Sequence, residues 1–294
     1  GNMMGTYPAF RMLKEFREHL PEGREFNVIY GNEVYTCDNM HVQDSTNRYG
    51  YNHLILLAKN QTGLENLIKI TSLAYTEGYY VKPRVDLDSI RKYSEGIVCL
   101  SACIVGVIPQ FLINNEYDKA KAYALELQSI FGKDDFYIEL QDHDLPDEKK
   151  ILPLLVKLAK EIGAKVVATN DVHYIKKEDY EAHDIMLRIQ TGKRVGEEVG
   201  MGFDSNNWYL KSYEEMYERF SWIPEALSNT IEIMDKCKNV IFKEKQIERL
   251  YPKYDKFCPP GETPESYLRK LCFDGLKKRY GDKLTKEHIE RAET

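Results

Sequence analysis

The chain has 294 residues, of which 43% are hydrophobic and 30% are charged, a composition typical of folded globular proteins and outside the range of disordered ones. Its net charge of −6, with no basic block beyond Lys277-Lys278-Arg279, argues against tight binding of DNA by this chain alone. Residues 97–109, the longest apolar stretch, are too short to cross a bilayer, and no apolar leader is present. The six cysteines form no CxxC pair. We therefore expect a cytoplasmic protein without a membrane partner.

Strands and helices are expected to alternate from about residue 26 to residue 190. Hydrophobic residues recur with a helical period from Ile151 to Ile162 and again from Leu64 to Ala74, where Thr62-Gly63-Leu64-Glu65 has the form of a capping box. The predicted strands are 26–35, 53–58, 97–101, 136–140 and 165–169. This alternation predicts an α/β fold with a parallel sheet or barrel.

The first two predicted strands are joined differently from the others. The connection, residues 36–50, is polar and too poor in apolar periodicity for a crossover helix. We therefore predict a β-hairpin, in which the end of one strand and the start of the next lie at the same edge. Glu33, placed near the end of the first strand, and His53, at the start of the second, would then face the same rim.

Beyond about residue 205 the chain is expected to be helical. Ser212-Tyr213-Glu214-Glu215 opens one helix, and residues 223–237, with Pro224 near their start, form another. A proline-rich break covers residues 251–261. Thr263-Pro264 then opens a helix to about Tyr280, and the charged residues 284–294 carry little core of their own.

Metal-capable side chains stand at the ends of several predicted strands. Asp171 and His173 follow the strand 165–169 at positions i and i+2, so an extended backbone points both to the same side. Strand ends are where barrel enzymes place their chemistry. A mixed set of carboxylate, imidazole and thiolate suits Zn, Mn or Fe. The six candidates are Glu33, His53, Cys103, His143, Asp171 and His173.

Each candidate also has a plainer interpretation. Glu33 alone reads as a solvated strand end, Cys103 as a core residue, and His143 as part of a surface loop. His183, on a predicted helix, reads as structural. The remaining histidines carry no context and are assigned to the surface; they are His19, His41 and His288. The joint placement of the six candidates at one rim is what favours a metal site.

The sequence resembles the PHP (polymerase and histidinol phosphatase) domain found at the amino end of bacterial replicative DNA polymerase III alpha subunits. The motifs include Gly31-Asn32-Glu33-Val34-Tyr35, Leu100-Ser101-Ala102-Cys103 and Glu139-Leu140-Gln141-Asp142-His143. The matching segments occur in the family's order over nearly the whole chain and are 31–35, 53–60, 73–78, 82–84, 100–103, 139–143, 168–174, 189–193, 208–212 and 224–230.

The resemblance implies a distorted TIM-like β/α barrel whose rim binds up to three metal ions. In metal-binding members these ions hydrolyse phosphoesters, and in some they support a 3′–5′ exonuclease. It further implies DNA-directed DNA synthesis with Mg in the parent polymerase, and DNA and replisome subunits as that protein's partners. The family's ligand positions correspond here to Glu33, His53, Cys103, Asp171 and His173, and no ligand role carries over to His143.

The sequence also departs from the family pattern. Four family ligands, in a His-x-His motif, a Leu-Asp-Gly turn and a Thr-Asp-His motif, would precede Gly1, so the first barrel strands are expected to be missing. We expect residues 1–243 to form the PHP domain and residues 244–294 the linker and start of the polymerase palm. For this fragment we expect weak or absent metal binding and hydrolysis, no polymerisation, and no assignable catalytic residue.

Three functions remain open at this point. The first is a metal-dependent phosphoesterase of the 3′–5′ exonuclease type, favoured by the five matching ligands. The second is a non-catalytic structural and interaction module of the polymerase, favoured by the missing ligands and the acidic charge. The third is a separate PHP-type phosphatase, which the polymerase-like residues from Trp208 onward oppose.

Overall fold

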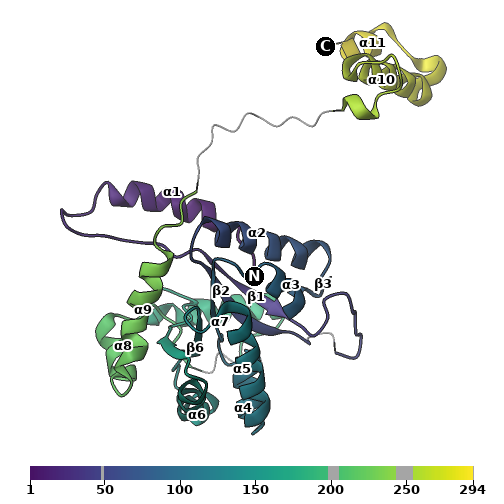
Figure 1. Cartoon of the computed structure of the whole chain (residues 1–294). Coiled ribbons are helices and arrows are strands. Elements are labelled where there is room, and N and C mark those ends of the chain that lie inside the picture. Colours follow the sequence, from purple (N-terminus) through teal and green to yellow (C-terminus); the bar gives the residue numbers. More distant parts are fainter. Residues whose placement is uncertain (48–49, 198–204, 243–253, 294) are drawn as a thin grey trace. The chain divides into compact units, whose positions relative to one another are not determined.

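The computed structural model describes residues 1–47, 50–197, 205–242 and 254–293. The chain divides into two compact units, Gly1–Phe242 and Lys243–Thr294 (Figure 1). The identities expected for the two parts, a PHP domain and the start of a palm, remain predictions.

The first unit is built on a mixed sheet of seven strands in the order β3-β4-β1-β2-β5-β6-β7. The predicted hairpin is confirmed, because β1 and β2 pair antiparallel. β5, β6 and β7 pair parallel to one another, while β2 pairs antiparallel to β5. In the part of the chain that the structure describes, β3 and β7 are the two outer strands of this order. The strands are β1 (Gly31–Thr36), β2 (Asn52–Ala58), β3 (Tyr79–Tyr80), β4 (Lys82–Val85), β5 (Ile97–Leu100), β6 (Phe136–Leu140) and β7 (Lys165–Ala168).

Helices alternate with these strands, as an α/β fold of the β/α barrel type requires (Figure 1). In the first unit they are α1 (Thr6–Arg17), α2 (Gln61–Thr76), α3 (Leu87–Lys92), α4 (Val107–Ile113), α5 (Tyr117–Phe131), α6 (Pro146–Ile162), α7 (Tyr180–Thr191), α8 (Tyr213–Phe220) and α9 (Pro224–Cys237). The second unit contains α10 (Pro264–Tyr280) and α11 (Lys286–Glu293). The predicted helix starts at Ser212 and Thr263 are confirmed, since both side chains accept a hydrogen bond from the backbone of the first turn.

The two faces of the sheet differ in what covers them, because successive side chains of a strand point to opposite sides. The outer face packs against α2, α4, α5 and α6 through one set of side chains, which includes Leu54, Leu56, Cys99, Phe136, Ile138 and Val166. The inner face packs against Ile233 and Cys237 of α9 through another set, Val98, Leu100, Tyr137 and Val167.

The amino ends of the parallel strands are tied to α9 by an ion-pair cluster that we call the basal network. Glu232 Oε1 lies 2.6 Å from Lys165 Nζ and accepts a hydrogen bond of 2.7 Å from the Tyr137 hydroxyl. Asp135 pairs with both Lys59 and Lys236. The network consists of Lys59, Asp135, Tyr137, Lys165, Glu232 and Lys236. α9 also reaches β7 through Asn229, whose side-chain amide donates to the Val166 carbonyl at 2.8 Å.

Two local predictions were wrong, and two short strands were missed. The first strand begins at Gly31 and not at residue 26, because Phe26 and Asn27 are bound by the Arg17 side chain instead of a neighbouring strand. The cap of α2 is Asn60, whose side chain accepts from the Gly63 amide at 2.9 Å, so the Thr62–Glu65 capping box does not form. Finally, the short strands β3 and β4 were not predicted.

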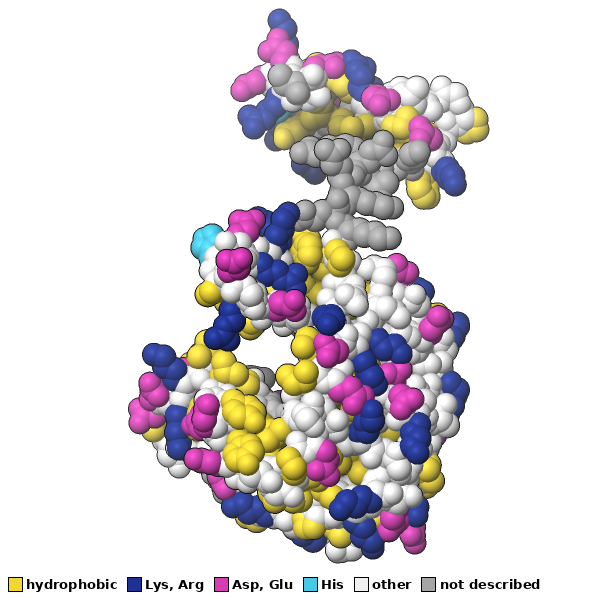
Figure 2. All heavy atoms as spheres, turned by 60° about the vertical axis from the view of Figure 1, so that its left-hand side comes forward, with side chains coloured by type: hydrophobic (Ala, Val, Ile, Leu, Met, Phe, Trp, Pro, Cys, Tyr) yellow, Lys and Arg dark blue, Asp and Glu magenta, His cyan; other side chains and the backbone are white. Residues whose placement is uncertain are grey.

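The surface of the first unit carries many exposed hydrophobic side chains, and Figure 2 shows a face on which they gather. Ile185, Met186 and Ile189 form an exposed stripe along α7. A groove of about 520 Å³ lies between β7, α8 and α9, with Tyr213, Tyr217 and Ile231 among its lining residues. None of the described helices combines the length and the hydropathy required to cross a bilayer.

Candidate metal centre

The five predicted ligands come from four places along one edge of the sheet, which we call the carboxyl rim. Glu33 is opposite Ile55 and Tyr35 is opposite His53, so Glu33 and His53 share the inner face as diagonal neighbours across the hairpin. Glu33 is the third residue of β1, whereas the prediction placed it near the end of the strand. Cys103 follows β5, and Asp171 and His173 follow β7.

Three of the five side chains converge. One donor atom each from Glu33, His53 and Cys103 all lie within 4.8 Å of one another. The His53 Nδ1 atom is 2.9 Å from Glu33 Oε1 and 3.5 Å from Cys103 Sγ. A strand pair and the turn after β5 therefore bring an oxygen, a nitrogen and a sulphur donor to one point.

The spacing of these donors can be compared with that of a metal site. Tetrahedral ligands at zinc-like bond lengths stand about 3.3–3.8 Å from one another. The separation of His53 and Cys103 falls in this range, while Glu33 is at hydrogen-bond distance from His53. Mixed oxygen, nitrogen and sulphur donors match Zn, Mn or Fe better than Ca or Mg. The residues present therefore fit a divalent transition metal.

Asp171 and His173 lie at the same rim but outside this group of three. Among the described residues, the single cluster with all donor atoms within 4.8 Å contains neither of them. His173 Nδ1 lies 3.9 Å from Asp171 Oδ1 and 2.8 Å from the Asp171 carbonyl oxygen. Asp171 has a φ of +40°, in the left-handed region that side chains rarely adopt.

The five groups lie close enough for their charges to affect one another's pKa values. Burial raises the pKa of the Cys103 thiol well above its usual value, and the Asp171 carboxylate raises it further. Burial also raises the pKa of Asp171, and the Glu33 carboxylate adds to the effect. Burial would raise the pKa of Glu33 too, but its hydrogen bond with His53 leaves that pKa below the usual value. The rim therefore holds negative groups that a bound cation would stabilise.

A buried carboxyl group that sequence reasoning missed lies behind the rim. Glu139, the fourth residue of β6, is 4% exposed and accepts hydrogen bonds from Thr169 Oγ1 at 2.5 Å and Gln141 Nε2 at 3.1 Å. Burial raises its pKa to about 7. The one indication in the sequence was that Glu139 interrupts an otherwise apolar strand, because an ionisable residue within a buried strand requires a special environment.

His143 is buried, so its interpretation as a surface-loop residue was wrong. It is 1% exposed, and its Nδ1 lies 2.8 Å from Glu148 Oε1. Its Nε2 lies 3.0 Å from the Asn170 carbonyl, and its ring stacks on Trp208 at 4.5 Å. Both ring nitrogens are engaged by the protein, which agrees with the absence of a predicted ligand role. His183 lies beside His173, with ring centroids 5.8 Å apart.

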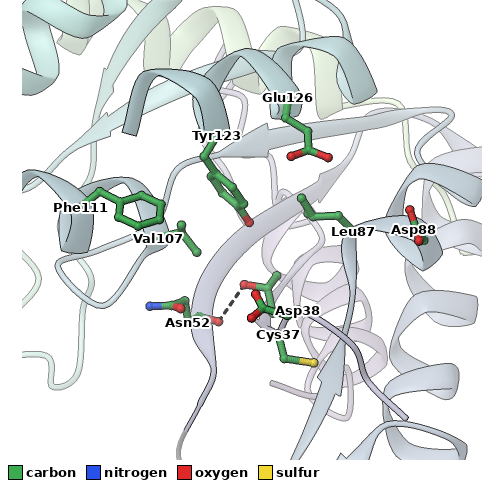
Figure 3. Close-up of a pocket in the computed structure, with 10 residues that line it drawn as sticks. Cys37, Asp38, Asn52, Leu87, Asp88, Val107, Phe111, Tyr123 and Glu126 are labelled. Atoms are coloured by element: carbon green, nitrogen blue, oxygen red, sulfur yellow. Dashed lines mark hydrogen bonds between the residues drawn. The ribbon is translucent and has the colours of Figure 1, made fainter. Parts of the chain in front are cut away.

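A separate pocket of about 420 Å³ opens near the end of β1 (Figure 3). Asp38, Asp88 and Glu126 supply its carboxylates, and Glu126 is paired with Arg91 at 3.2 Å. Figure 3 shows Tyr123 and Phe111 on the side formed by the helices, and Cys37 and Asp38 on the other side of the pocket, in the chain after β1. None of the five predicted ligands lines this pocket, so it is distinct from the group formed by Glu33, His53 and Cys103.

Comparison with known proteins gives two results. Residues 1–143 match the PHP domain family. The chain is also similar to the DNA polymerase III subunit alpha of several bacteria.

The relative from Borreliella burgdorferi is 40% identical over 298 positions, which cover 99% of this chain and 24% of that protein. The relative from Thermus aquaticus is 40% identical over 80% of this chain and 19% of that protein. The relative from Aquifex aeolicus is 35% identical over 100% of this chain and 26% of that protein. The chain thus spans about a quarter of the length of the relatives it matches.

Proposed function

We propose that this chain forms the PHP region of a DNA polymerase III alpha subunit, because residues 1–143 match the PHP domain family and the chain aligns over almost its whole length with such subunits. We further propose that its carboxyl rim is a divalent metal site of the phosphoesterase or 3′–5′ exonuclease type. DNA synthesis, and contacts with DNA and replisome subunits, would belong to the parent protein.

One observation carries the metal proposal, namely the convergence of Glu33, His53 and Cys103 within 4.8 Å. These three residues would hold a Zn, Mn or Fe ion, and Asp171 and His173, which follow β7 at the same rim, would supply further donors. A metal ion in such a site lowers the pKa of bound water and polarises phosphoryl oxygens.

The protein groups contribute orientation and charge. His53 is fixed between Glu33 and Cys103, so its ring can turn little without breaking one of two contacts. The Cys103 thiol has to lose its proton before it can bind a metal. The inner face of the sheet is closed by the buried side chains of Leu100 and Tyr137, which pack against α9.

The experiment is a titration of the dialysed chain with Zn²⁺ or Mn²⁺ against a chromogenic chelator. We expect reversible binding that extensive dialysis removes, and a His53→Ala variant that keeps its fold but no longer competes with the chelator. His41→Ala, at an exposed position outside the rim, is the matched control. Equal metal affinity of the His53→Ala variant and the wild-type chain would contradict the proposal.

A second candidate function is a structural and interaction module of the polymerase. The exposed apolar stripe of α7 and the groove between α8 and α9 favour it, because monomeric proteins rarely leave large apolar patches uncovered. A chain that binds no metal, together with loss of polymerase assembly on substituting Ile185 and Ile189 by Ser in the parent protein, would favour this candidate over the first. The third candidate, a separate phosphatase, is opposed by the near-complete alignment with polymerase subunits.

A further inference from the structure

The segment that follows β7 and carries Asp171 and His173 is held by a second segment from much further along the chain. This second segment is residues 205–211, and we call it the strap. The backbone amide of His173 donates to the Trp208 carbonyl at 2.9 Å, and the Leu210 amide donates to the Ile175 carbonyl at 3.1 Å. Tyr174 and Tyr209 form a parallel bridge. The strap therefore pairs with the segment that carries Asp171 and His173.

Asn170 is the residue through which the strap reaches the start of that segment. Its side-chain amide donates to the Tyr209 carbonyl at 2.6 Å, and its side-chain oxygen accepts from Lys211 Nζ at 2.9 Å. Lys211 is itself buried and donates to the Asn207 carbonyl as well. One side chain next to Asp171 is thus fixed at both of its polar ends.

The backbone of Asn170 is fixed from the other side. His143 Nε2 donates to the Asn170 carbonyl at 3.0 Å, and Glu148 of α6 holds the opposite ring nitrogen of His143. Trp208 of the strap stacks on the same His143 ring at 4.5 Å with an interplanar angle of 4°. Asn170 therefore lies at the junction of α6, the strap and the ligand segment.

Such anchoring has a physical purpose here. Asp171 adopts a left-handed backbone conformation that an unrestrained chain would leave. Residues that orient metal ligands without binding the metal themselves commonly contribute to metal affinity, because they hold the ligands in the geometry that binding requires. We propose that Asn170 is a positioning residue of the metal centre, which holds Asp171 and His173 in place by joining them to the strap. This inference rests on the metal function proposed above.

The test compares two asparagine variants of the full chain. Asn170→Ala removes the amide between the ligand segment and the strap. Asn229→Ala removes a side-chain amide that also donates to a backbone carbonyl, that of Val166 in the adjoining strand, but lies on α9 away from the rim. Asn170 makes two such side-chain hydrogen bonds and Asn229 makes one, so urea unfolding of both variants measures the stability that each loses, and the changes at the rim are compared after allowance for that difference.

The first measurement needs no metal. Amide hydrogen exchange at His173 and Leu210 should become about tenfold faster in Asn170→Ala, relative to amides of β6, and remain unchanged in Asn229→Ala. If Asn170→Ala does not fold, Lys211→Met, which removes a single arm of the junction, replaces it in the comparison.

The second measurement is affinity for Zn²⁺ alone by chelator competition, together with the ligand-field spectrum of bound Co²⁺. Asn170→Ala should lower the affinity about 10–100-fold and shift the Co²⁺ bands, and Asn229→Ala should do neither. Identical exchange, affinity and spectra in the two variants would overturn the inference. A wild-type chain that binds neither ion would refute the proposed metal function, while the exchange comparison would still decide whether Asn170 fixes the segment.

Discussion

At the amino ends of the strands, the carboxylates of the basal network each meet ammonium groups, as Asp135 meets Lys59 and Lys236. At the carboxyl rim, Glu33 and Asp171 face imidazoles, a thiol and each other. Most of the pKa values follow this difference. Burial would raise the pKa of Glu232, but hydrogen bonds from Lys165, Tyr137 and Lys236 lower it to about 2. Burial raises the pKa values of Asp171 and Glu139, whereas Glu33 is the exception at the rim, because its hydrogen bond with His53 leaves its pKa below the usual value.

The basal network is thus a charge cluster that stabilises the fold, whereas the carboxyl rim carries charge that a ligand would neutralise. Paired and hydrogen-bonded carboxylates add to folding stability, whereas buried carboxylates without a cation subtract from it. The rim is therefore the place where the fold gives up stability, as functional sites commonly do. Four experiments test whether the two ends differ in this way.

The largest expected effect is that of Glu139→Gln. The folded-state pKa of Glu139 is raised to about 7 from 4.5, so the folded chain binds the proton more tightly than the unfolded chain does. Stability should therefore fall by about 3 kcal/mol as pH rises from about 4.5 to about 7, and the glutamine variant should lack this loss. Urea unfolding at pH 5 and pH 8 measures it; a variant less stable than wild type at pH 8 would contradict the assignment.

The next effect concerns metal binding at the rim. Cys103→Ala should weaken Zn²⁺ binding by about 100-fold, because loss of a direct ligand costs at least as much as loss of its outer partners. Cys99→Ala removes a thiol that is also buried but lies on the outer face. It should reduce stability and leave affinity unchanged. Equal affinities for the two variants would remove Cys103 from the site.

In the basal network, Glu232→Gln should destabilise the chain by about 1–2 kcal/mol at pH 7, after allowance for its partial exposure. Glu161, which is equally exposed and pairs with Lys121, is the control, and Glu161→Gln should have a smaller effect. Because the pKa of Glu232 is lowered, its contribution is present above about pH 4.5 and is lost as pH falls towards 2. Similar losses in both variants would show that the network is an ordinary surface cluster.

The fourth experiment concerns the pH dependence of metal binding. The raised pKa of Cys103 means that the thiol stays protonated without a metal, so binding releases a proton. Affinity for Zn²⁺ should rise about tenfold for each pH unit between 6 and 8, and this slope should disappear in Cys103→Ala. A flat profile in the wild-type chain would mean that the thiol is not a ligand.

Much of the fold was predictable from local patterns. The limits of β6 follow from a short, fully buried run of mostly apolar residues. The helices that begin at Ser212 and Thr263 follow from their capping residues and, in α10, from the proline at the first helical position. The start of α2 was not, because Gly63 approaches the Gly96 backbone so closely that a Cβ there would collide with the Gly96 carbonyl. That tertiary contact favours Asn60 as the cap, and nothing in the local sequence reports it.

The candidate site was also predictable in part from local patterns. Strand alternation and the hairpin predicted that Glu33, His53 and the side chains after β5 and β7 would share one edge. The sequence could not show that Cys103 joins Glu33 and His53 while Asp171 and His173 stand apart. Nor could it reveal the strap, because the pairing of Trp208 with His173 joins positions 35 residues apart through tertiary structure.

The bond from Asn229 to the Val166 carbonyl has a consequence for how this protein behaves at high concentration. An outer strand with free carbonyl and amide groups is a template on which foreign chains can assemble into fibrils. Here a helix side chain occupies an acceptor in the middle of the outer strand β7. Purified samples should therefore resist aggregation through the outer edge of β7 for as long as α9 stays packed against that strand.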